Sequence, residues 1–308
     1  MTLTNFNVND VKVLHVEPTT ACNAACPQCS RELSHLYNDN IHRNNLTVEK
    51  ILDVLNHKFI KNLDKMFMCG DFGDPAASNE TLPIFKLFRS INPTIELGLN
   101  TNGGIQNVNW WRELGKLLNQ PTDFCVFSID GLQDTNHIYR KNVRFDKVVN
   151  NAKSFINAGG SAHWDMLVFE HNEHQIDECL ELARNLGFTW FRAKISKRFQ
   201  TVPVAGLNPP KNFNSPDLVY TNNIKCHALN EKSMYLTATG ELYPCCWIGN
   251  QVFSKDETLD KIINSENFNL LTNTWNTNPY STCVRNCSVT EQNLSNFEKQ
   301  WFRNEQLR

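Results

Sequence analysis

The feature that most constrains the fold is an alternation of strand and helix patterns, which repeats six times between residues 10 and 197. The predicted strands cover residues 11–16, 65–69, 94–99, 124–129, 163–169 and 189–195. The clearest helical runs are residues 47–55, 110–118, 145–158 and 175–186. Repeated strand–helix units produce a parallel sheet, and eight such units close a barrel in about 250 residues. Six units of about 31 residues therefore predict an α/β fold in the form of an open, three-quarter barrel.

The predicted strands alternate apolar and polar side chains, whereas buried parallel strands normally read as continuous apolar runs. In the third strand, Ile95 and Leu97 alternate with Glu96 and Gly98, and the fourth and sixth strands show the same pattern. Because successive side chains point to opposite faces, each strand has one apolar and one polar face. A polar interior implies a ligand cavity. An open antiparallel sheet with one wet face is the alternative, and the intervening helices argue against it.

Three cysteines, Cys22, Cys26 and Cys29, follow the first predicted strand. Three thiolates can hold three corners of a cubane iron–sulfur cluster, whereas complete ligation by protein takes four. The fourth iron is then left open for a ligand that is not protein. The alternatives are three structural thiols, or a zinc knuckle that lacks one ligand. Structural zinc sites normally have four protein ligands.

The Cys-x3-Cys-x2-Cys spacing resembles the signature of the radical SAM enzymes. In that superfamily the open iron binds S-adenosylmethionine, and one electron from the [4Fe-4S] cluster cleaves its sulfonium. The resemblance implies that a 5′-deoxyadenosyl radical then takes hydrogen from an unactivated carbon. It also implies a partial (β/α)6 TIM-like barrel, which we place at residues 1–198. Gln28 departs from the family pattern, in which the residue before the third cysteine is usually aromatic.

Glycines and polar residues follow the predicted strands, at the edge where barrels of this kind carry their chemistry. The turn of residues 70–75 resembles the Gly-Glu-Pro-like turn of the family, whose backbone and acid recognise the methionine ammonium. Gly73 and Asp74 occupy the matching positions, and aspartate in place of glutamate shortens the reach but keeps the charge. Arg140 resembles the arginine that contacts the cofactor carboxylate in some members.

Two further segments, residues 100–104 and 128–131, resemble those that line the cofactor site in related enzymes. Asn100, Ser128 and Asp130 are the candidates to bond the ribose or the carboxylate. A single Gly-rich turn is a weak signal. Four polar segments at strand ends, behind a cysteine signature, are together a strong indication of a cofactor site.

Five more cysteines occur near the end of the chain: Cys226, Cys245, Cys246, Cys283 and Cys287. Residues 234–244 read as a β-hairpin that turns near Gly240. The set resembles the SPASM/twitch extension of radical SAM enzymes, and five cysteines fit the one-cluster twitch version better than the roughly seven of a full SPASM module. The predicted ligands of a second [4Fe-4S] cluster are Cys226, Cys245, Cys283 and Cys287, with Cys246 as a spare or an alternate to Cys245. A structural zinc ribbon on the same four residues is the alternative.

The prolines after the barrel predict a linker over residues 199–223, which leaves residues 224–308 as a twitch/SPASM-like domain. The end of that domain predicts a packing helix over residues 290–307, which covers an open side of the barrel. The helical spacing is carried by Leu294, Phe297 and Trp301.

The composition argues against several classes of function. A formal net charge of −2 over 308 residues disfavours a nucleic-acid-binding surface. No apolar run is long enough to span a bilayer, and the polar first residues do not read as a secretory signal. We therefore expect a cytoplasmic protein with no membrane partner. Eleven cysteines in such a chain indicate metal binding in place of disulfides.

These features together predict a radical SAM oxidoreductase that abstracts hydrogen from carbon of a peptide or protein substrate. The alternative substrate is a small metabolite, such as a sugar, nucleotide or cofactor precursor, processed by an oxidase or dehydrogenase. The prediction includes a flavodoxin- or ferredoxin-like electron donor as partner. An alternative from another class is a non-catalytic Fe–S or zinc scaffold that binds a partner protein. Loss of a cluster cysteine would favour the scaffold, and all three are present.

Overall fold

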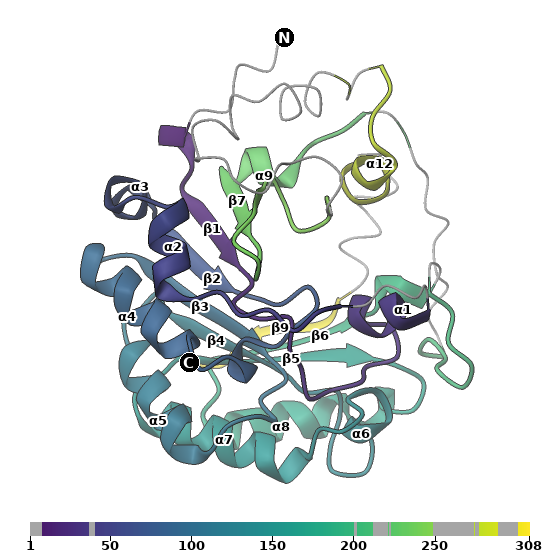
Figure 1. Ribbon diagram of the computed structural model, residues 1–308. Helices are drawn as coiled ribbons and strands as arrows, with labels where there is room; N and C mark the ends of the chain where they lie inside the picture. The colour runs from purple at the N-terminus through teal and green to yellow at the C-terminus, as the bar shows by residue number, and fades with distance from the viewer. Residues whose placement is uncertain are drawn as a thin grey trace.

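The computed structural model describes residues 8–36, 41–199, 202–211, 221, 223–248, 274, 277–288 and 301–308. At its centre, six parallel strands pair in chain order and form a curved sheet (Figure 1). They are β1 (Val13–Val16), β2 (Lys65–Met68), β3 (Glu96–Thr101), β4 (Phe124–Ser128), β5 (Ala162–Val168) and β6 (Trp190–Ile195). Each end lies within two residues of its predicted position. The predicted parallel α/β architecture is confirmed.

Helices cover the convex face of this sheet (Figure 1). These helices are α2 (Val48–Val54), α3 (His57–Asn62), α4 (Thr81–Ile91), α5 (Val108–Leu117), α7 (Phe145–Asn157) and α8 (Ile176–Leu186). The other described helical segments are η1 (Val8–Asp10), α1 (Ser30–Leu36), η2 (Pro75–Ala77), α6 (Asn136–Tyr139), η3 (Glu173–Gln175), η4 (Lys197–Phe199), α9 (His227–Asn230) and α12 (Ser281–Cys287). Within the described ranges, no helix combines the length and the apolar character that a membrane crossing requires.

Burial alternates along the barrel strands as the sequence predicts. In β5, Trp164 and Met166 are buried against the helices, whereas His163 and Asp165 face the interior and are half-buried. The core lies between sheet and helices, where the ring of Phe127 contacts those of Trp111, Phe155 and Phe188. The concave side of the sheet is therefore left to polar and aromatic side chains.

A β-hairpin extends the sheet beyond β1. Its strands are β7 (Ser233–Leu236) and β8 (Leu242–Tyr243), which pair antiparallel, and its turn contains Gly240 at φ +86°. The predicted hairpin is thus confirmed. β7 also pairs in parallel with β1, so the hairpin is continuous with the barrel sheet. The division of the chain at residues 198 and 224 stays a prediction.

A further strand, β9 (Trp301–Gln306), extends the sheet beyond β6, with which it pairs antiparallel. The predicted helix is therefore wrong for this part of residues 290–307, and Leu294 and Phe297 lie outside the described residues. The open edge of β6 presents unpaired backbone groups, and a strand satisfies them where a helix cannot. Three residues at helical spacing are a weaker signal than this tertiary pairing.

Candidate functional site

The cysteine trio lies on the loop between β1 and α1, at the C-terminal edge of the parallel sheet. A tight turn closes this loop, since the backbone N–H of Cys29 donates to the carbonyl of Cys26 at 2.9 Å. The N–H of Ala25 donates to the carbonyl of Lys141 at 3.1 Å, which ties the loop to the segment after α6. The loop is thus internally ordered and held at one side of the barrel mouth.

Burial and neighbouring negative charges hold the thiols of Cys22 and Cys26 in their protonated form. Burial raises the pKa of Cys22 to about 12, and the charges of Asp74, Cys26 and Cys29 act in the same direction. Burial also raises the pKa of Cys26, while the Arg140 guanidinium opposes that rise. Because the thiolate is the metal ligand, such thiols ionise only when a cation replaces the proton.

The donor set suits a cluster better than a single ion. In the part of the chain that the structure describes, no three His, Cys, Asp or Glu side chains gather closely enough for one metal ion. A cubane cluster binds each thiolate to a different iron, so its ligands stand further apart. Three neighbouring thiols on one half-buried loop therefore fit the three-cysteine ligand set of a [4Fe-4S] cluster.

The turn after β2 packs directly against the cysteine loop. A Cβ on Gly73 would stand 1.8 Å from the carbonyl oxygen of Thr19, so only glycine fits there. The carboxylate of Asp74 is buried, and it accepts hydrogen bonds from Thr101 Oγ1 at 2.8 Å and from the N–H of Asn102 at 2.7 Å. It also accepts from Ala76 N at 2.9 Å, which caps η2. Asp74 thus joins the loops after β2 and β3.

Glu17 is a site residue that the sequence reasoning did not assign. It is 2% exposed, and its Oε1 accepts from the backbone N–H groups of Phe72 (2.7 Å) and Gly73 (3.1 Å). Its Oε2 accepts from the hydroxyl of Tyr235 in β7 at 2.6 Å. Glu17 therefore anchors the turn after β2 to both β1 and the hairpin. The available signal was an acidic residue directly after a buried strand.

Asn102 is a second site residue that was not singled out. Its Nδ2 donates to Asn23 Oδ1 at 2.9 Å and approaches the sulfur of Cys22 at 3.7 Å. Its Oδ1 accepts from the N–H of Gly104 at 2.8 Å. The amide therefore links the loop after β3 to the first cysteine.

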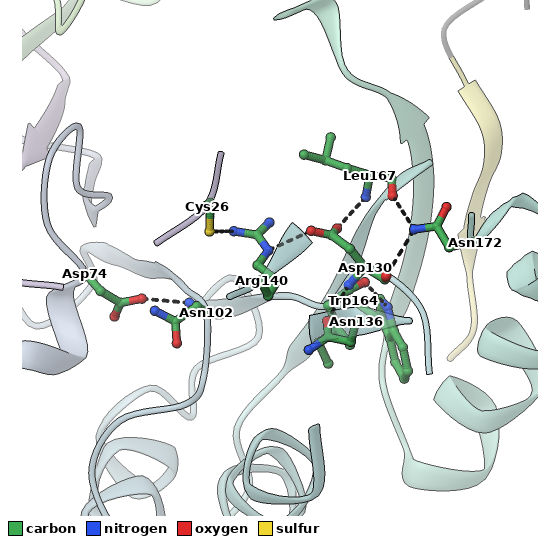
Figure 2. A network of polar contacts seen from close by, with 10 residues as sticks. Cys26, Asp74, Asn102, Asp130, Asn136, Arg140, Trp164, Leu167 and Asn172 are labelled. Carbon is green, nitrogen blue, oxygen red and sulfur yellow. Dashed lines mark hydrogen bonds and ion pairs between the residues drawn. The ribbon is translucent and has the colours of Figure 1, made fainter. Parts of the chain in front are cut away.

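Asp130 and Arg140 form a buried pair beside the second cysteine (Figure 2). Arg140 Nε donates to Asp130 Oδ2 at 2.7 Å, and Arg140 Nη1 lies 3.8 Å from the sulfur of Cys26. The other oxygen of Asp130 accepts from the N–H of Leu167 at 2.6 Å. Asp130 thus holds Arg140 against the cysteine loop. A direct bond from Asp130 to the ribose stays a prediction.

Asn100 and Ser128 occupy the ends of β3 and β4 and are half-buried on the interior face. The Oδ1 of Asn100 is buried and has no hydrogen-bond partner among the described residues. A buried polar atom is normally satisfied, so an orphaned one marks a position where a ligand can bond. The cysteine trio fits a cluster, and this unpartnered oxygen fits a polar cofactor beside it.

The buried hydrogen bonds of Gln28 account for its departure from the family pattern. It is fully buried, and its side chain accepts from Ser196 Oγ at 3.0 Å and donates to the carbonyl of Val202 at 3.1 Å. Its backbone carbonyl accepts from Arg198 Nη1 at 2.8 Å. The amide therefore fastens the cysteine loop to the end of β6, across the mouth of the barrel.

Comparison with known proteins identifies the family. The sequence profile of the Radical SAM superfamily matches residues 16–188, which contain the trio and the loops described above. The chain belongs to the radical SAM superfamily. This is a family of enzymes, and membership implies a [4Fe-4S] cluster and S-adenosylmethionine as cofactors. No curated protein sequence matches the chain.

Solved radical SAM structures share the fold at low sequence identity. Native anSMEcpe with bound AdoMet and Kp18Cys peptide has a TM-score of 0.59 at 12% identity, covering 93% of this chain and 95% of that one. Streptococcus suis SuiB bound to precursor peptide SuiA has a TM-score of 0.56 at 15% identity, and the match covers 90% of this chain and 67% of SuiB. BtrN in complex with AdoMet and 2-DOIA has a TM-score of 0.53 at 11% identity, and the match covers 91% of this chain and 94% of BtrN. These likenesses establish the radical SAM barrel fold.

The second cysteine set lies beside the radical SAM barrel, between α9, β8 and α12. The predicted ligands line one small cavity: Cys226, Cys245, Cys283 and Cys287. Ile224, Trp247 and Ile248 line the same cavity, which makes it apolar. A hydrogen bond from the Cys226 thiol lowers the pKa of Cys287. The structure thus brings together the four cysteines that the sequence singled out.

Cys246 follows Cys245 in the chain and also lies close to residues of the barrel. Burial raises its pKa, and the charges of Asp71, Cys245 and Cys69 add to the effect. It is absent from the lining of the cavity that holds Cys245. Among the two alternatives for that ligand, the geometry favours Cys245.

Proposed function

We propose that this radical SAM enzyme is an oxidoreductase that reductively cleaves S-adenosylmethionine and abstracts hydrogen from carbon of a peptide or protein substrate. The observation that supports it most is the meeting of Cys22, Cys26 and Cys29 with the donors Asn102 and Arg140 over a polar barrel interior. Such an arrangement binds an anionic cluster and a zwitterionic cofactor in one place.

The trio is the part of the chain that holds the cluster. When bound, the cluster supplies one electron to the sulfonium of S-adenosylmethionine and so gives rise to a 5′-deoxyadenosyl radical. The turn at Gly73 and Asp74 lies against the cysteine loop and offers its carbonyls and carboxylate to the methionine ammonium. Three hydrogen bonds hold the Asp74 carboxylate in place, so binding requires little reordering.

The interior ends of β3 and β4 take the nucleoside part of the cofactor. The unpartnered Oδ1 of Asn100 accepts from a ribose hydroxyl, and Ser128 on the neighbouring strand bonds the second one. Arg140 directs its remaining N–H groups toward the methionine carboxylate, and Asp130 keeps the guanidinium oriented. The role of Asp130 in this proposal is therefore positioning.

Anaerobic reconstitution tests the core of the proposal. Protein reconstituted with iron and sulfide, then reduced in the presence of S-adenosylmethionine, should form 5′-deoxyadenosine. Cys26→Ala should abolish this product, because two thiols cannot hold the cluster. Cys125→Ala is the matched control, since Cys125 is buried in β4 and is no predicted ligand. An intact cluster without any 5′-deoxyadenosine would instead support the non-catalytic scaffold.

The proposal includes an auxiliary [4Fe-4S] cluster at Cys226, Cys245, Cys283 and Cys287, in a twitch-type extension. Four ligands leave such a cluster no open iron, so it would pass electrons during substrate oxidation. We expect about eight irons per chain, falling to about four in Cys283→Ala and remaining at about eight in Cys246→Ala. About four irons with one zinc in the wild type would favour the zinc ribbon.

The proposed substrate class rests on the relatives. SuiB and anSMEcpe are described with bound peptides, whereas BtrN is described with 2-DOIA, which keeps a small metabolite as the alternative. Two of the three relatives are thus described with peptides, which favours a peptide for this chain.

Isotope transfer distinguishes the two substrate classes. Candidate peptides and small metabolites carrying deuterium on carbon are incubated with the reduced enzyme and S-adenosylmethionine. We expect deuterium to appear in 5′-deoxyadenosine with a peptide, because the transferred hydrogen comes from the substrate carbon. Transfer only from a metabolite would select the alternative. The proposed electron donor, a flavodoxin or ferredoxin, should replace the chemical reductant in the same assay.

A further inference from the structure

The Arg140 guanidinium makes a contact that cofactor recognition does not require. Its Nη1 lies 3.8 Å from the sulfur of Cys26, as Figure 2 shows, while its Nε bonds Asp130. We propose that Arg140, held by Asp130, donates an N–H···S bond to the cluster ligand Cys26 and thereby raises the reduction potential of the catalytic cluster. This inference rests on the proposed function, since it takes the trio as the cluster site.

The surroundings of Asp130 hold the guanidinium in one orientation. The carboxylate is 0% exposed and accepts from Leu167 N at 2.6 Å, and its backbone carbonyl accepts from Asn172 Nδ2 at 3.0 Å. The side chain of Arg140 is only 16% exposed. A planar donor fork that is fixed at Nε keeps its Nη1 pointing in a constant direction. The contact with Cys26 is therefore a persistent feature of the fold.

The direction of the effect follows from charge. Reduction adds one negative charge to the cluster and its thiolates, so an N–H donor on a ligand sulfur stabilises the reduced form more than the oxidised form. Charge-assisted hydrogen bonds are roughly twice as strong as neutral ones. The pair with Asp130 leaves little net charge, so the directed N–H carries the effect.

This role is compatible with a contact to the cofactor carboxylate. A guanidinium has five N–H donors. One is used at Asp130 and one at Cys26, which leaves three for a carboxylate placed beside the cluster. The potential must therefore be measured without S-adenosylmethionine, so that only the contact with the sulfur is tested.

The experiment is an EPR-monitored redox titration of the reconstituted full-length protein, without S-adenosylmethionine. The signal of the catalytic cluster is the one that changes in the wild type when the cofactor is added. The main variant is Asp130→Asn combined with Arg140→Met, which removes the N–H···S bond without burying an unpaired charge. We expect the reduction equilibrium to become about tenfold less favourable, which is about 59 mV for one electron.

The chain offers a matched control in a second buried pair. Arg89 and Asp123 are 17% and 0% exposed, close to the 16% and 0% of Arg140 and Asp130, and their side chains are 2.5 Å apart. Asp123 Oδ1 likewise accepts a backbone N–H, that of Leu97, at 2.8 Å. Asp123→Asn combined with Arg89→Met should cost similar stability and change the reduction equilibrium less than twofold.

The experiment distinguishes failure of this inference from failure of the proposed function. A double variant of Asp130 and Arg140 whose equilibrium stays within twofold of the wild type would overturn the inference and leave the proposed function intact. A wild type that holds no reducible cluster at the trio would overturn both. If the double variant does not assemble a cluster, Asp130→Asn combined with Arg140→Gln decides, since it also removes the guanidinium without leaving an unpaired buried charge and must lower the potential. An unchanged potential there would overturn the inference equally.

Discussion

At the scale of single residues, the site is organised by buried carboxylates that bond neighbouring loops. Glu17 fixes the turn after β2, Asp74 joins that turn to the loop after β3, and Asp130 holds Arg140. Each lies at the carboxyl end of a strand, where backbone N–H groups of the following loops are free to be bonded. The groups that face the cofactor are thereby positioned before it binds, which limits the ordering entropy of binding.

Gly73→Ala tests how closely these loops must approach. The new Cβ would lie 1.8 Å from the carbonyl oxygen of Thr19 and 2.7 Å from its carbon, both backbone atoms that cannot rotate away. We expect a loss of about 1–3 kcal/mol in the free energy of unfolding and a reduced iron content, because the turn must move off the cysteine loop. Urea unfolding and iron analysis measure both quantities.

Gly206→Ala serves as its control. A Cβ on Gly206 meets nothing within 4 Å, although the φ of +77° makes a side chain mildly unfavourable there. We expect the free energy of unfolding to fall by about 1 kcal/mol and the iron content to equal that of the wild type. Equal iron contents in the two variants would show that the contact at Thr19 does not position the cysteine loop.

At the scale of elements, the pairing of the flanking strands β7 and β9 with the six-stranded sheet is what local sequence could not predict. The inner strands were predictable because their side chains alternate with period two and are separated by amphipathic helices. β9 was mistaken for a helix, since its pairing partner β6 lies more than a hundred residues away in the chain. The roles of Glu17 and Asn102 were not predicted for the same reason, because their hydrogen-bond partners come from distant segments of the chain.

The candidate site divides in the same way. Cys22, Cys26 and Cys29 were predictable because their spacing is local, and the four polar segments because they follow predicted strands. The partners of these residues were not predictable. That Asp130 faces Arg140, and that Cys246 does not line the cavity that holds Cys245, depend on how loops fold over the barrel mouth. Sequence thus predicts which groups are present, and packing decides which of them touch.

Tyr235→Phe tests whether the hairpin supports the site. The variant removes the hydroxyl that bonds Glu17 Oε2 at 2.6 Å and leaves a buried carboxylate oxygen without that donor. We expect a loss of about 1–3 kcal/mol in the free energy of unfolding and weaker binding of S-adenosylmethionine, since Glu17 also holds the N–H of Gly73. Urea unfolding and isothermal titration calorimetry measure the two effects.

Tyr243→Phe, in the partner strand of the same hairpin, is the control. Its hydroxyl lies 3.4 Å from Glu241, away from the turn after β2. We expect cofactor affinity to remain at the wild-type value. If both tyrosine variants bind the cofactor equally, β7 has no part in holding the turn.

At the scale of the whole molecule, the polar interior makes stability depend on pH. Two interior histidines are held neutral. Burial lowers the pKa of His15 to about 4, and burial together with Arg192 and Lys65 lowers that of His163 to about 4. The His15 ring packs against Phe67 and Tyr235 at 4.6 and 4.7 Å, and its Nε2 bonds the carbonyl of Cys69 at 2.6 Å.

The fall in stability should appear between about pH 6.5 and pH 4. In the unfolded chain a histidine takes up its proton near pH 6.5, whereas in the fold His15 does so only near pH 4. Between these values the unfolded chain binds more protons, so the free energy of unfolding is full above pH 6.5 and decreases as the pH falls. We expect His15 to account for about 1–2 kcal/mol of the loss at pH 5.

Urea unfolding of the wild type and of His15→Phe at pH 7 and pH 5 measures the contribution of His15 to this loss of stability. Phenylalanine keeps the ring packing and cannot be protonated, so the variant should lose about 1–2 kcal/mol less than the wild type between the two pH values. It should nevertheless be the less stable protein at pH 7, because the bond to the Cys69 carbonyl is gone. Replacing the exposed His57 by glutamine should leave the wild-type fall unchanged. If His15→Phe loses as much as the wild type, His15 contributes nothing to the acid sensitivity of the barrel.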